Sequence, residues 1–354
     1  MKTIRFWTSH ACKNPAQWSQ WLELDPGEFR LVHDPVDPQW LFGGEHLYLN
    51  RRKRREFLEL LSPRRLSLYF AIEAVEPDLN LFDYAVAHDR HFANNDRIGR
   101  CPVFAFNNYL GHAYPDLSSG ASDPQSELER KNGFCSFLYS NPKSHPRRDW
   151  IFKTLSQYKK VDSLGPHLHN CDVPTSRFDR DWKRLAIKLK RSYKFDIAAE
   201  NARFYGYTTE KIMSSFMART VPIYWGNPLI AEEFNPEAFV NANGMEAEEL
   251  LETVRRIDDD DNLWCRMVSA PPMTPVHVSR SEHDLKSYRQ WTARVFGMNL
   301  DDAHRRPEGT WAEIYKNQFK TPLSRFVLNH NWAAFPGKIR SKATTIVSKF
   351  RFFD

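Results

Sequence analysis

At 354 residues the chain is longer than one ordinary hydrophobic core supports, so its length predicts two domains of about 100–200 residues each. A hydrophobic content of 41% with 14% aromatic residues excludes a disordered protein, and no apolar run approaches the roughly 20 residues that span a bilayer. The net charge of +6 comes mostly from residues 321–354, which hold six basic side chains and one acidic side chain; the nearly neutral remainder, without a nucleic-acid-binding motif, excludes a DNA- or RNA-binding protein.

The cysteines indicate the compartment. Five cysteines are scattered along the chain, odd in number and without a Cys-x-x-Cys pair, which argues against a disulfide framework. Residues 1–9 hold a single Lys and a short strand-like run, unlike a signal peptide. We therefore expect a protein of a reducing compartment, the cytoplasm.

The first part of the chain alternates strand-like and helix-like segments. Strand-like apolar runs occur at 3–8, 29–33, 39–42, 66–72 and 81–87. Helical patterns occur around 18–21 and at 51–61. This alternation is typical of an α/β domain with a largely parallel sheet. The basic run Arg51–Arg55 could bind an anion, but the charged start of a solvated helix is the more common interpretation of such a run.

Residues 114–132, rich in Ser, Asp, Pro and Gly, are predicted to be a linker or long loop. The alternation then restarts, with strands predicted at 134–140, 193–200 and 221–225 and helices at 148–158 and 209–219. Two successive α/β units predict two Rossmann-like domains that face a cleft. We expect their boundaries, and that of a basic tail, at 1–128, 129–320 and 321–354.

The stretch around Glu200 combines residues that suit a ligand. A predicted strand ends at Glu200, and a predicted helix begins at Thr208 or Thr209. In open α/β sheets, ligands lie beyond the carboxyl ends of strands, where free N–H groups and the helix dipole favour a diphosphate. Lys211 in the first turn adds a positive charge, and Glu210 can accept hydrogen bonds from ribose hydroxyls. Each residue alone is a weak signal, but together they predict a site for a nucleoside diphosphate.

This stretch resembles the α-1,3/4-fucosyltransferase family, whose signature combines a Glu-Asn pair, a Tyr-x-Thr-Glu-Lys element and a Pro-x-x-x-Gly strand. The chain supplies these elements in order as Glu200-Asn201, Tyr207–Lys211 and Pro222–Gly226. The resemblance implies that Glu210 binds the ribose and Lys211 the pyrophosphate of a GDP-fucose donor. It also implies donor contacts for Glu200, Asn201 and Tyr207.

Two further stretches carry the resemblance over most of residues 65–245. Ser140-Asn141-Pro142 followed by Arg148 resembles the family's strand, loop and helix with a phosphate-binding arginine, whose planar fork binds oxygens in pairs and stays charged. Asn141 and Arg148 are thus implied as donor-binding residues, and Arg148 with Lys211 as catalytic groups that stabilise the departing GDP. Arg147 is adjacent, so a shift of one residue in register would exchange it with Arg148.

The general base is expected in the first domain. Counting back from the Phe-Asp-Tyr strand at 82–84 places the family's base at Glu73, and Glu76 is the alternative three residues later. Ala71-Ile72 stands where family members often have Thr-Gly. This departure affects the backbone directly before Glu73.

The resemblance implies a GT-B fold, with an acceptor-binding first domain that carries the base and a donor-binding second domain. It implies an inverting α-1,3-fucosyltransferase that transfers fucose from GDP-fucose to an N-acetylglucosamine hydroxyl of a lactosamine-type oligosaccharide acceptor. With fixed cations on the donor side, no metal or other cofactor is required. A related transferase with another nucleotide sugar, and a non-catalytic protein that binds a sugar nucleotide or a membrane, are the alternatives.

Two other clusters have the residue types of metal sites. Asp258–Asp261 is similar to the Asp-x-Asp motifs of other glycosyltransferases, but it follows a predicted helix at 246–257 and is expected to be a solvated helix end or loop. His167-x-His169-x-Cys171 lacks a second cluster that would complete a tetrahedral set, so we expect a surface loop there.

The tail from Gly337 to Asp354 can form a helix with one apolar face and basic residues around it. The apolar face would consist of Ile339, Ala343, Ile346, Val347 and Phe350. A basic amphipathic helix is typical of a membrane-surface anchor, and a helix that packs on the first domain is the alternative. The resemblance favours peripheral attachment to the inner face of the cell membrane.

Overall fold

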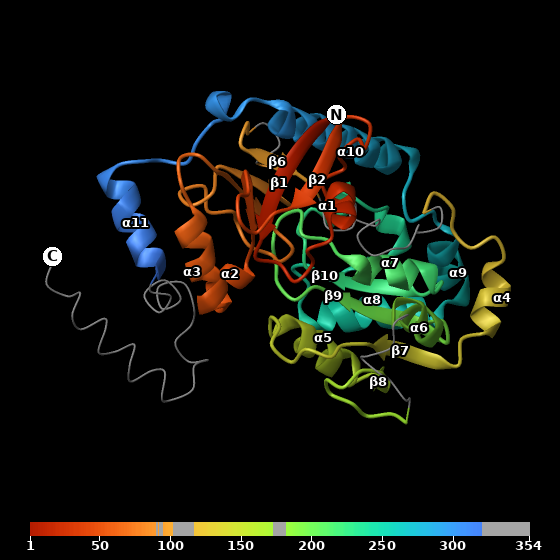
Figure 1. Cartoon of the computed structure of the whole chain (residues 1–354). Coiled ribbons are helices and arrows are strands. Elements are labelled where there is room, and N and C mark those ends of the chain that lie inside the picture. The colour runs from red at the N-terminus through yellow and green to blue at the C-terminus, as the bar shows by residue number, and fades with distance from the viewer. Residues whose placement is uncertain (90, 92–94, 102–116, 173–181, 321–354) are drawn as a thin grey trace, which may run out of the picture. The chain divides into compact units, whose positions relative to one another are not determined.

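The computed structural model describes all residues except 90, 92–94, 102–116, 173–181 and 321–354 (Figure 1). The described chain divides into two compact units, each with its own parallel sheet. The first unit comprises Met1–Val86, Asp96–Gly99 and the described residues from Thr292 onward; the second comprises Ala87–Asn95 and Arg100–Trp291. The predicted α/β class with two Rossmann-like units is confirmed.

The units divide the chain at other places than the predicted boundaries after residues 128 and 320. Helix α10 (Pro275–Gly297) belongs to the second unit up to Trp291 and to the first from Thr292. The returning segment packs on the first sheet, where the ring of Phe296 lies 4.6 Å from that of Trp40 and Arg306 pairs with the buried Asp83 at 2.6 Å. These contacts join residues more than 200 positions apart, so no local pattern could reveal them.

The first unit is built on a six-stranded sheet in the order β2-β1-β3-β4-β5-β6. Its strands are β1 (Lys2–Thr8), β2 (Phe29–His33), β3 (Trp40–Gly43), β4 (Leu66–Phe70), β5 (Tyr84–Ala87) and β6 (Ile98–Arg100). Its helices are α1 (Pro15–Trp21), α2 (His46–Leu49), α3 (Arg51–Leu60), the 3-10 turn Leu300–Asp302 and α11 (Thr310–Lys320). The pairs β1–β2, β1–β3, β3–β4 and β4–β5 are parallel.

Aromatic side chains form much of the core of the first unit. The ring of Trp18 lies 4.9 Å from that of Phe42 and 5.3 Å from that of Phe70, while Phe6 stacks on Phe42 at 4.9 Å. Trp18 is placed there because Asn14 caps α1 by accepting the Ala16 N–H. The helix thereby presents its tryptophans to the apolar strands, which are buried on both faces as parallel strands require.

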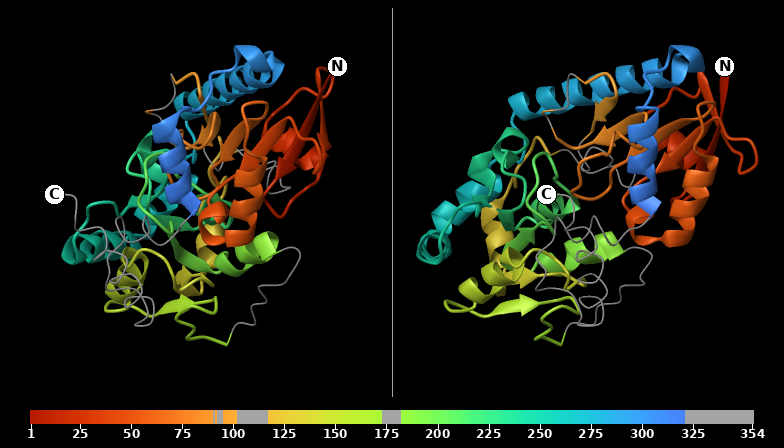
Figure 2. Two further views of the ribbon diagram at one scale, coloured as in Figure 1. Left: turned by 60° about the vertical axis from the view of Figure 1, so that its left-hand side comes forward. Right: turned by 90° about the vertical axis from the view of Figure 1, so that its left-hand side faces the viewer.

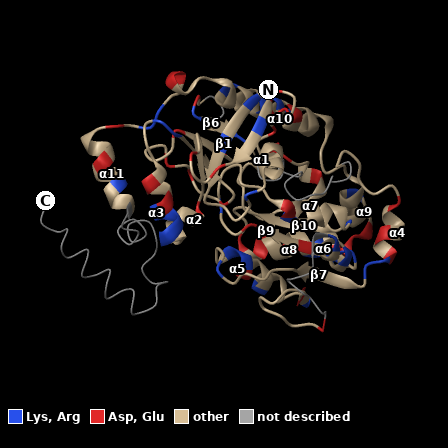
Figure 3. Ribbon diagram, in the orientation of Figure 1, with Lys and Arg blue, Asp and Glu red and all other residues tan. Residues whose placement is uncertain are grey.

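The basic run at 51–55 opens α3 (Figure 3). Arg52 and Arg55 pair with glutamates four residues later and are largely exposed, as a solvated helix start predicts. Arg54 departs from this expectation because it is buried and donates to the carbonyls of Leu47 and Tyr48. Its guanidinium also lies over the ring of Phe319 from α11, which runs beside α3 (Figure 2).

The second unit is built on a five-stranded sheet in the order β11-β10-β9-β7-β8, with all its pairs parallel. Its strands are β7 (Gly133–Phe137), β8 (Val161–Ser163), β9 (Tyr193–Ala199), β10 (Val221–Trp225) and β11 (Val240–Asn241). Its helices are α4 (Pro124–Glu129), α5 (Arg147–Leu155), α6 (Trp182–Lys190), α7 (Glu210–Met217), α8 (Ala247–Asp259), α9 (Asp261–Ser269) and the main part of α10, with 3-10 turns at Ile230–Glu232 and Pro236–Ala238.

Alternate residues of β9 and β10 face two separate cores. Ile197 and Ile223 point to the face covered by α5, α8 and α9, whereas Ala198 and Tyr224 point to the face covered by α7 and the segment after β10. Because side chains alternate along a strand, burial on both faces requires near-continuous apolar runs. These runs are what made the two strands predictable, and both predictions are confirmed within a residue.

The linker predicted at 114–132 was wrong in part, since α4 lies within it. Asp123 caps this helix by accepting the Ser126 N–H, and Pro124 occupies its first position. These are standard helix-start residues, which the Ser- and Gly-rich composition around them obscured. The strand predicted at 81–87 also begins later, at Tyr84, because Leu81 and Phe82 are core residues of a turn.

Two expectations about membranes and disulfides concern the whole chain. The tail at 337–354 lies outside the described residues. In the described part of the chain, no helix combines the length and apolar character that crossing a bilayer requires. All five cysteines are described, and each is a free thiol in this structure.

Acid should destabilise the first unit through His10. Burial, with the neighbouring His46, lowers the pKa of His10 from 6.5 to about 3. Below pH 6.5, His10 is protonated in the unfolded chain but stays neutral in the folded chain. The free energy of unfolding therefore falls as the pH falls from 6.5 towards 3. Urea unfolding of wild type should lose roughly 3 kcal/mol more between pH 7 and pH 4.5 than unfolding of His10→Asn. Parallel losses in the two proteins would contradict this.

Candidate active site

The candidate site of the second unit lies where β9 ends and α7 begins. Glu200 follows the last residue of β9. Its N–H donates to the Trp225 carbonyl at 2.8 Å, which continues the pairing of β9 with β10 by one residue. Gly226, with a φ of +152°, makes room for it, since a Cβ there would lie 2.5 Å from the Glu200 Cγ. The sequence thus brings an acidic side chain into the buried space beside the start of α7.

The carboxylate of Glu200, a predicted donor contact, holds two residues at the start of α7. The side chain is buried and accepts from the Thr209 N–H at 2.8 Å, from the Thr209 hydroxyl, and from the Lys211 ammonium at 2.9 Å. Thr209 is the N-cap residue of α7, yet its side chain makes no capping bond within the helix. Glu200 therefore positions Thr209 and Lys211 and leaves the first N–H groups of α7 without a side-chain cap from Thr209.

Lys211 and Glu210 lie together in the first turn of α7. The Lys211 ammonium lies 2.9 Å from Glu200 and 3.7 Å from Glu210. Burial opposes the charge on Lys211, but the two carboxylates outweigh it and raise its pKa. Burial likewise opposes the charge of Glu210, while Lys211 and the backbone lower its pKa. Both side chains are therefore charged at neutral pH.

The structure distinguishes the two adjacent arginines at the start of α5. Arg148 is buried, donates to the Ala199 carbonyl at the end of β9 at 3.2 Å, and lies over the Tyr139 ring at 4.0 Å. Arg147 instead stacks on Trp150 and donates to the Met245 carbonyl, away from β9. Only Arg148 reaches the strand end that carries Glu200.

Arg148 has no carboxylate within ion-pair distance among the described residues. Its Nε atom is buried and has no hydrogen-bond partner in the described part of the chain. A buried guanidinium without a counter-charge is costly unless a ligand supplies one. The arrangement therefore suits an anion beside the carboxyl end of β9.

The remaining predicted donor residues, Asn201, Tyr207 and Asn141, differ in their burial and in their contacts. Asn201 follows Glu200 and is half-buried, and its carbonyl accepts the His145 N–H. Tyr207 is buried three residues before α7, with its ring 5.4 Å from that of His88. Asn141 is exposed in the loop after β7, where its side chain accepts the Lys143 N–H. No described contact joins Asn141 to the cluster around Glu200.

Sequence reasoning missed the residues that fix the loop before α7. Asn227 is fully buried; its side chain accepts the Gly206 N–H at 2.9 Å and donates to the Thr208 hydroxyl at 3.1 Å. Thr208 in turn donates to Glu233 at 2.6 Å, and Glu233 pairs with the buried Arg100 at 3.1 Å. These partners come from separate parts of the chain, so their only local signal was Asn227 directly after the Pro-x-x-x-Gly strand.

Glu73, the predicted base, lies in the turn after β4 of the first unit. The side chain is exposed, and its backbone N–H donates to the Glu45 carboxylate at 2.9 Å. Glu76 is also exposed. The backbone at Glu73 is thus fixed by a side chain from the neighbouring strand end, which is the kind of support a catalytic group requires.

Comparison with known families decides the class of this site. Residues 128–295 match the model of glycosyltransferase family 10 (fucosyltransferase), carboxyl-terminal part. The match spans the second unit's sheet and contains Arg148, Glu200, Glu210 and Lys211. Residues 128–295 are a fucosyltransferase-family domain.

Curated relatives agree with this assignment. An alpha-(1,3)-fucosyltransferase of Helicobacter pylori is 27% identical over 249 residues, which cover 62% of this chain and 49% of that protein. The human GDP-fucose protein O-fucosyltransferase 3 is 27% identical over 208 residues, which cover 51% of this chain and 43% of that protein. The chain therefore spans less than half the length of these relatives.

Solved structures give the fold. The crystal structure of an alpha1,3-fucosyltransferase with GDP aligns with a TM-score of 0.61 at 19% identity, and the alignment covers 86% of this chain and 93% of that one. A second structure of an alpha1,3-fucosyltransferase aligns with a TM-score of 0.62 at 20% identity. The predicted GT-B fold is confirmed.

Neither metal-like cluster of the fucosyltransferase domain has free ligands. Asp258 is buried and pairs with Lys159 and, at 3.2 Å, with Lys194. It is thus a structural anion, whereas a solvated helix end had been predicted. The Nε2–H of His167 donates to the Asp149 carboxylate at 2.7 Å. Within the described residues, no group of three or more His, Cys, Asp and Glu could hold a metal ion.

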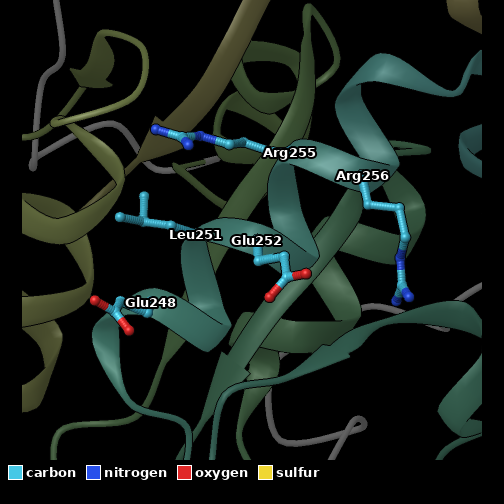
Figure 4. A pocket seen from close by; sticks show the side chains of 5 residues that line it. All are labelled: Glu248, Leu251, Glu252, Arg255 and Arg256. Carbon is cyan, nitrogen blue, oxygen red and sulfur yellow. The ribbon is translucent and has the colours of Figure 1, made fainter.

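A hollow on the outer surface of the fucosyltransferase domain runs along α8 (Figure 4). It is lined by Glu248, Leu251, Glu252, Arg255 and Arg256, all from this helix. The two acidic and two basic side chains balance one another, and none of the predicted donor residues lines the hollow. It is a surface feature of α8 and not a candidate active site.

Proposed function

We propose that this chain is an inverting α-1,3-fucosyltransferase that transfers L-fucose from GDP-fucose to an N-acetylglucosamine hydroxyl of a glycan. The observation that carries the proposal is the buried Arg148, which lacks a carboxylate partner in the described chain and reaches the end of β9 beside Glu200 and Lys211. Two fixed cations at one strand end suit the diphosphate of a nucleotide sugar. The family of residues 128–295 supports fucose as the sugar.

On the donor side, Lys211 and Arg148 bind the pyrophosphate and Glu210 accepts hydrogen bonds from the ribose hydroxyls. The further donor contacts of this proposal are Glu200, Asn201, Tyr207 and the more distant Asn141. Because the two cations neutralise the charge that develops on the β-phosphate, the reaction needs no metal. Transfer in the presence of a chelator, at the rate without it, tests this point.

In the proposed reaction, the acceptor hydroxyl attacks the anomeric carbon of fucose from the side opposite GDP. The new carbon–oxygen bond forms as the bond to the β-phosphate oxygen breaks, so the configuration inverts. Glu73 accepts the hydroxyl proton, and Arg148 with Lys211 stabilises the departing GDP. These side chains interact most strongly with the transition state. There the hydroxyl proton is passing to Glu73 and negative charge is developing on the β-phosphate.

The acceptor class has two candidates. An alpha-(1,3)-fucosyltransferase relative supports a glycan acceptor, whereas a protein O-fucosyltransferase relative at the same identity supports a protein hydroxyl. We propose the glycan because the signature at 200–226 resembles the α-1,3/4 enzymes. We further propose a cytoplasmic protein, with its basic tail on the inner face of the membrane.

A donor and acceptor panel tests the proposal. Purified protein is incubated with GDP-fucose, GDP-mannose or UDP-N-acetylglucosamine, each with a lactosamine glycan or a serine- and threonine-containing peptide, and nucleotide release is followed. Release that requires both GDP-fucose and the glycan is expected. Nucleotide release with the peptide but not the glycan would show that the acceptor is a protein hydroxyl. Release with a nucleotide sugar other than GDP-fucose would show that the proposed donor is wrong. No release with any pair would contradict the proposal that the chain is a transferase.

Removal of the Lys211 charge should weaken donor binding. Lys211→Met keeps the length of the side chain but removes an ammonium that Glu200 and Thr209 hold in place. We expect the Kd for GDP to rise on the order of 10–100-fold, the loss of one charge-assisted contact. Calorimetry measures it, with Lys188→Met, an exposed lysine of α6, as the matched control. An unchanged Kd for GDP in Lys211→Met would show that Lys211 does not bind the donor.

A further inference from the structure

Glu45 lies at the carboxyl edge of the first sheet and was not among the predicted site residues. It follows the end of β3, directly before α2, and its side chain is half-buried. β3 and β4 are parallel neighbours with Gly43 opposite Tyr69. Glu45 therefore stands next to the turn that leaves β4, and this turn carries Glu73.

One oxygen of Glu45 holds that turn. Its Oε1 accepts the Ile72 N–H at 2.6 Å and the Glu73 N–H at 2.9 Å. The turn is closed on its other side by the Val75 N–H, which donates to the Glu73 carbonyl at 2.8 Å. Two charge-assisted bonds from one fixed oxygen set the direction in which the Glu73 side chain leaves the backbone.

We propose that Glu45 is a positioning residue for the base Glu73: its carboxylate fixes the backbone of the turn after β4 and thereby the place of the Glu73 side chain. This inference rests on the proposed function. In this role Glu45 acts through the backbone of the turn, because its Oε1 accepts two N–H groups there. The proton passes from the acceptor oxygen to the Glu73 carboxylate as the bond to fucose forms.

The surroundings of Glu45 act on its own carboxyl group. Burial raises the pKa of Glu45, the backbone N–H donors oppose this, and the neighbouring Glu73 carboxylate raises it further. Glu45 in turn raises the pKa of the buried Tyr69 of β4. The imidazole of His10 borders the adjacent Gly44 and stays neutral.

Two substitutions separate positioning from charge. Glu45→Ala removes both the acceptor and the charge, whereas Glu45→Gln keeps an oxygen that can accept the same two N–H groups. We expect Glu45→Ala to lower kcat by about 10–100-fold with little change in the Kd for GDP, a misplaced base being the cause. Glu45→Gln should restore most of kcat, because the amide oxygen can keep the two backbone bonds that hold the turn. Glu59→Gln, an exposed carboxylate of α3, is the matched control and should match wild type in kcat and in the Kd for GDP.

Three outcomes would overturn the inference. If Glu45→Gln is as inactive as Glu45→Ala while Glu73→Gln remains active, Glu45 is the base itself. If both Glu45 variants match wild type in kcat, Glu45 has no role. If Glu45→Ala does not fold, as circular dichroism would reveal, a folded Glu45→Gln whose kcat is lowered about 10-fold or more overturns the inference. A wild-type protein without transfer would instead contradict the proposed function.

Discussion

Replacing Glu73 with glutamine is expected to lower kcat by roughly 10²–10⁴-fold, the usual contribution of a general base. The amide keeps the size of the side chain but cannot accept the hydroxyl proton at neutral pH. Because Glu73 belongs to the first unit and the proposed donor residues belong to the second, the Kd for GDP should stay unchanged. Steady-state kinetics with GDP-fucose and a lactosamine acceptor, beside calorimetry with GDP, measures both quantities.

Glu76 supplies the matched control for this prediction. It is a glutamate of the same turn region, exposed like Glu73, but its backbone N–H is not held by Glu45. Glu76→Gln should retain the kcat of wild type. Loss of transfer in Glu76→Gln with retention in Glu73→Gln would move the base three residues along the chain.

Replacing Arg148 with methionine should lower kcat/KM by about 10²–10³-fold, the scale of removing a preorganised group that stabilises developing charge. Its guanidinium is buried between Tyr139 and the end of β9 and has no carboxylate partner in the described chain. An anion at this place would supply the missing counter-charge. Steady-state kinetics measures the loss, and calorimetry should find weaker GDP binding as well.

The same substitution should leave stability unchanged or raise it by about 1 kcal/mol, because an uncompensated buried charge disappears. GDP should raise the Tm of wild type but much less that of Arg148→Met, since only a ligand that binds the folded state stabilises it. Arg148→Lys keeps the positive charge but lacks the planar guanidinium, so its kcat/KM should lie between those of wild type and Arg148→Met. A strongly destabilised Arg148→Met with unaltered GDP binding would make Arg148 a purely structural residue.

The sequence was most informative where one segment carries the whole signal. β9, α7 and β10 were predicted within one or two residues because their apolar periods are local. The same stretch holds Glu200, Glu210 and Lys211, so the donor residues could be found together. The order of these motifs, and not any single residue, made the family recognisable.

The sequence was least informative where partners come from distant segments. The contacts of the Glu200 carboxylate with Thr209 and Lys211 could not be predicted, because they depend on the close approach of Gly226. Asp258 was predicted to be solvated, but two lysines from other elements hold it buried. Such pairings depend on how strands and helices pack, which no spacing along the chain encodes.

Direct detection of the product tests the central claim most simply. The protein is incubated with GDP-fucose and a type 2 lactosamine glycan, and the glycan is analysed by mass spectrometry and NMR. We expect the glycan to gain one deoxyhexose, linked in the α configuration to the 3-hydroxyl of N-acetylglucosamine. Glu73→Gln should not form this product. An unmodified glycan with a wild-type protein that binds GDP would contradict the account, as would a product that Glu73→Gln still forms at the wild-type rate.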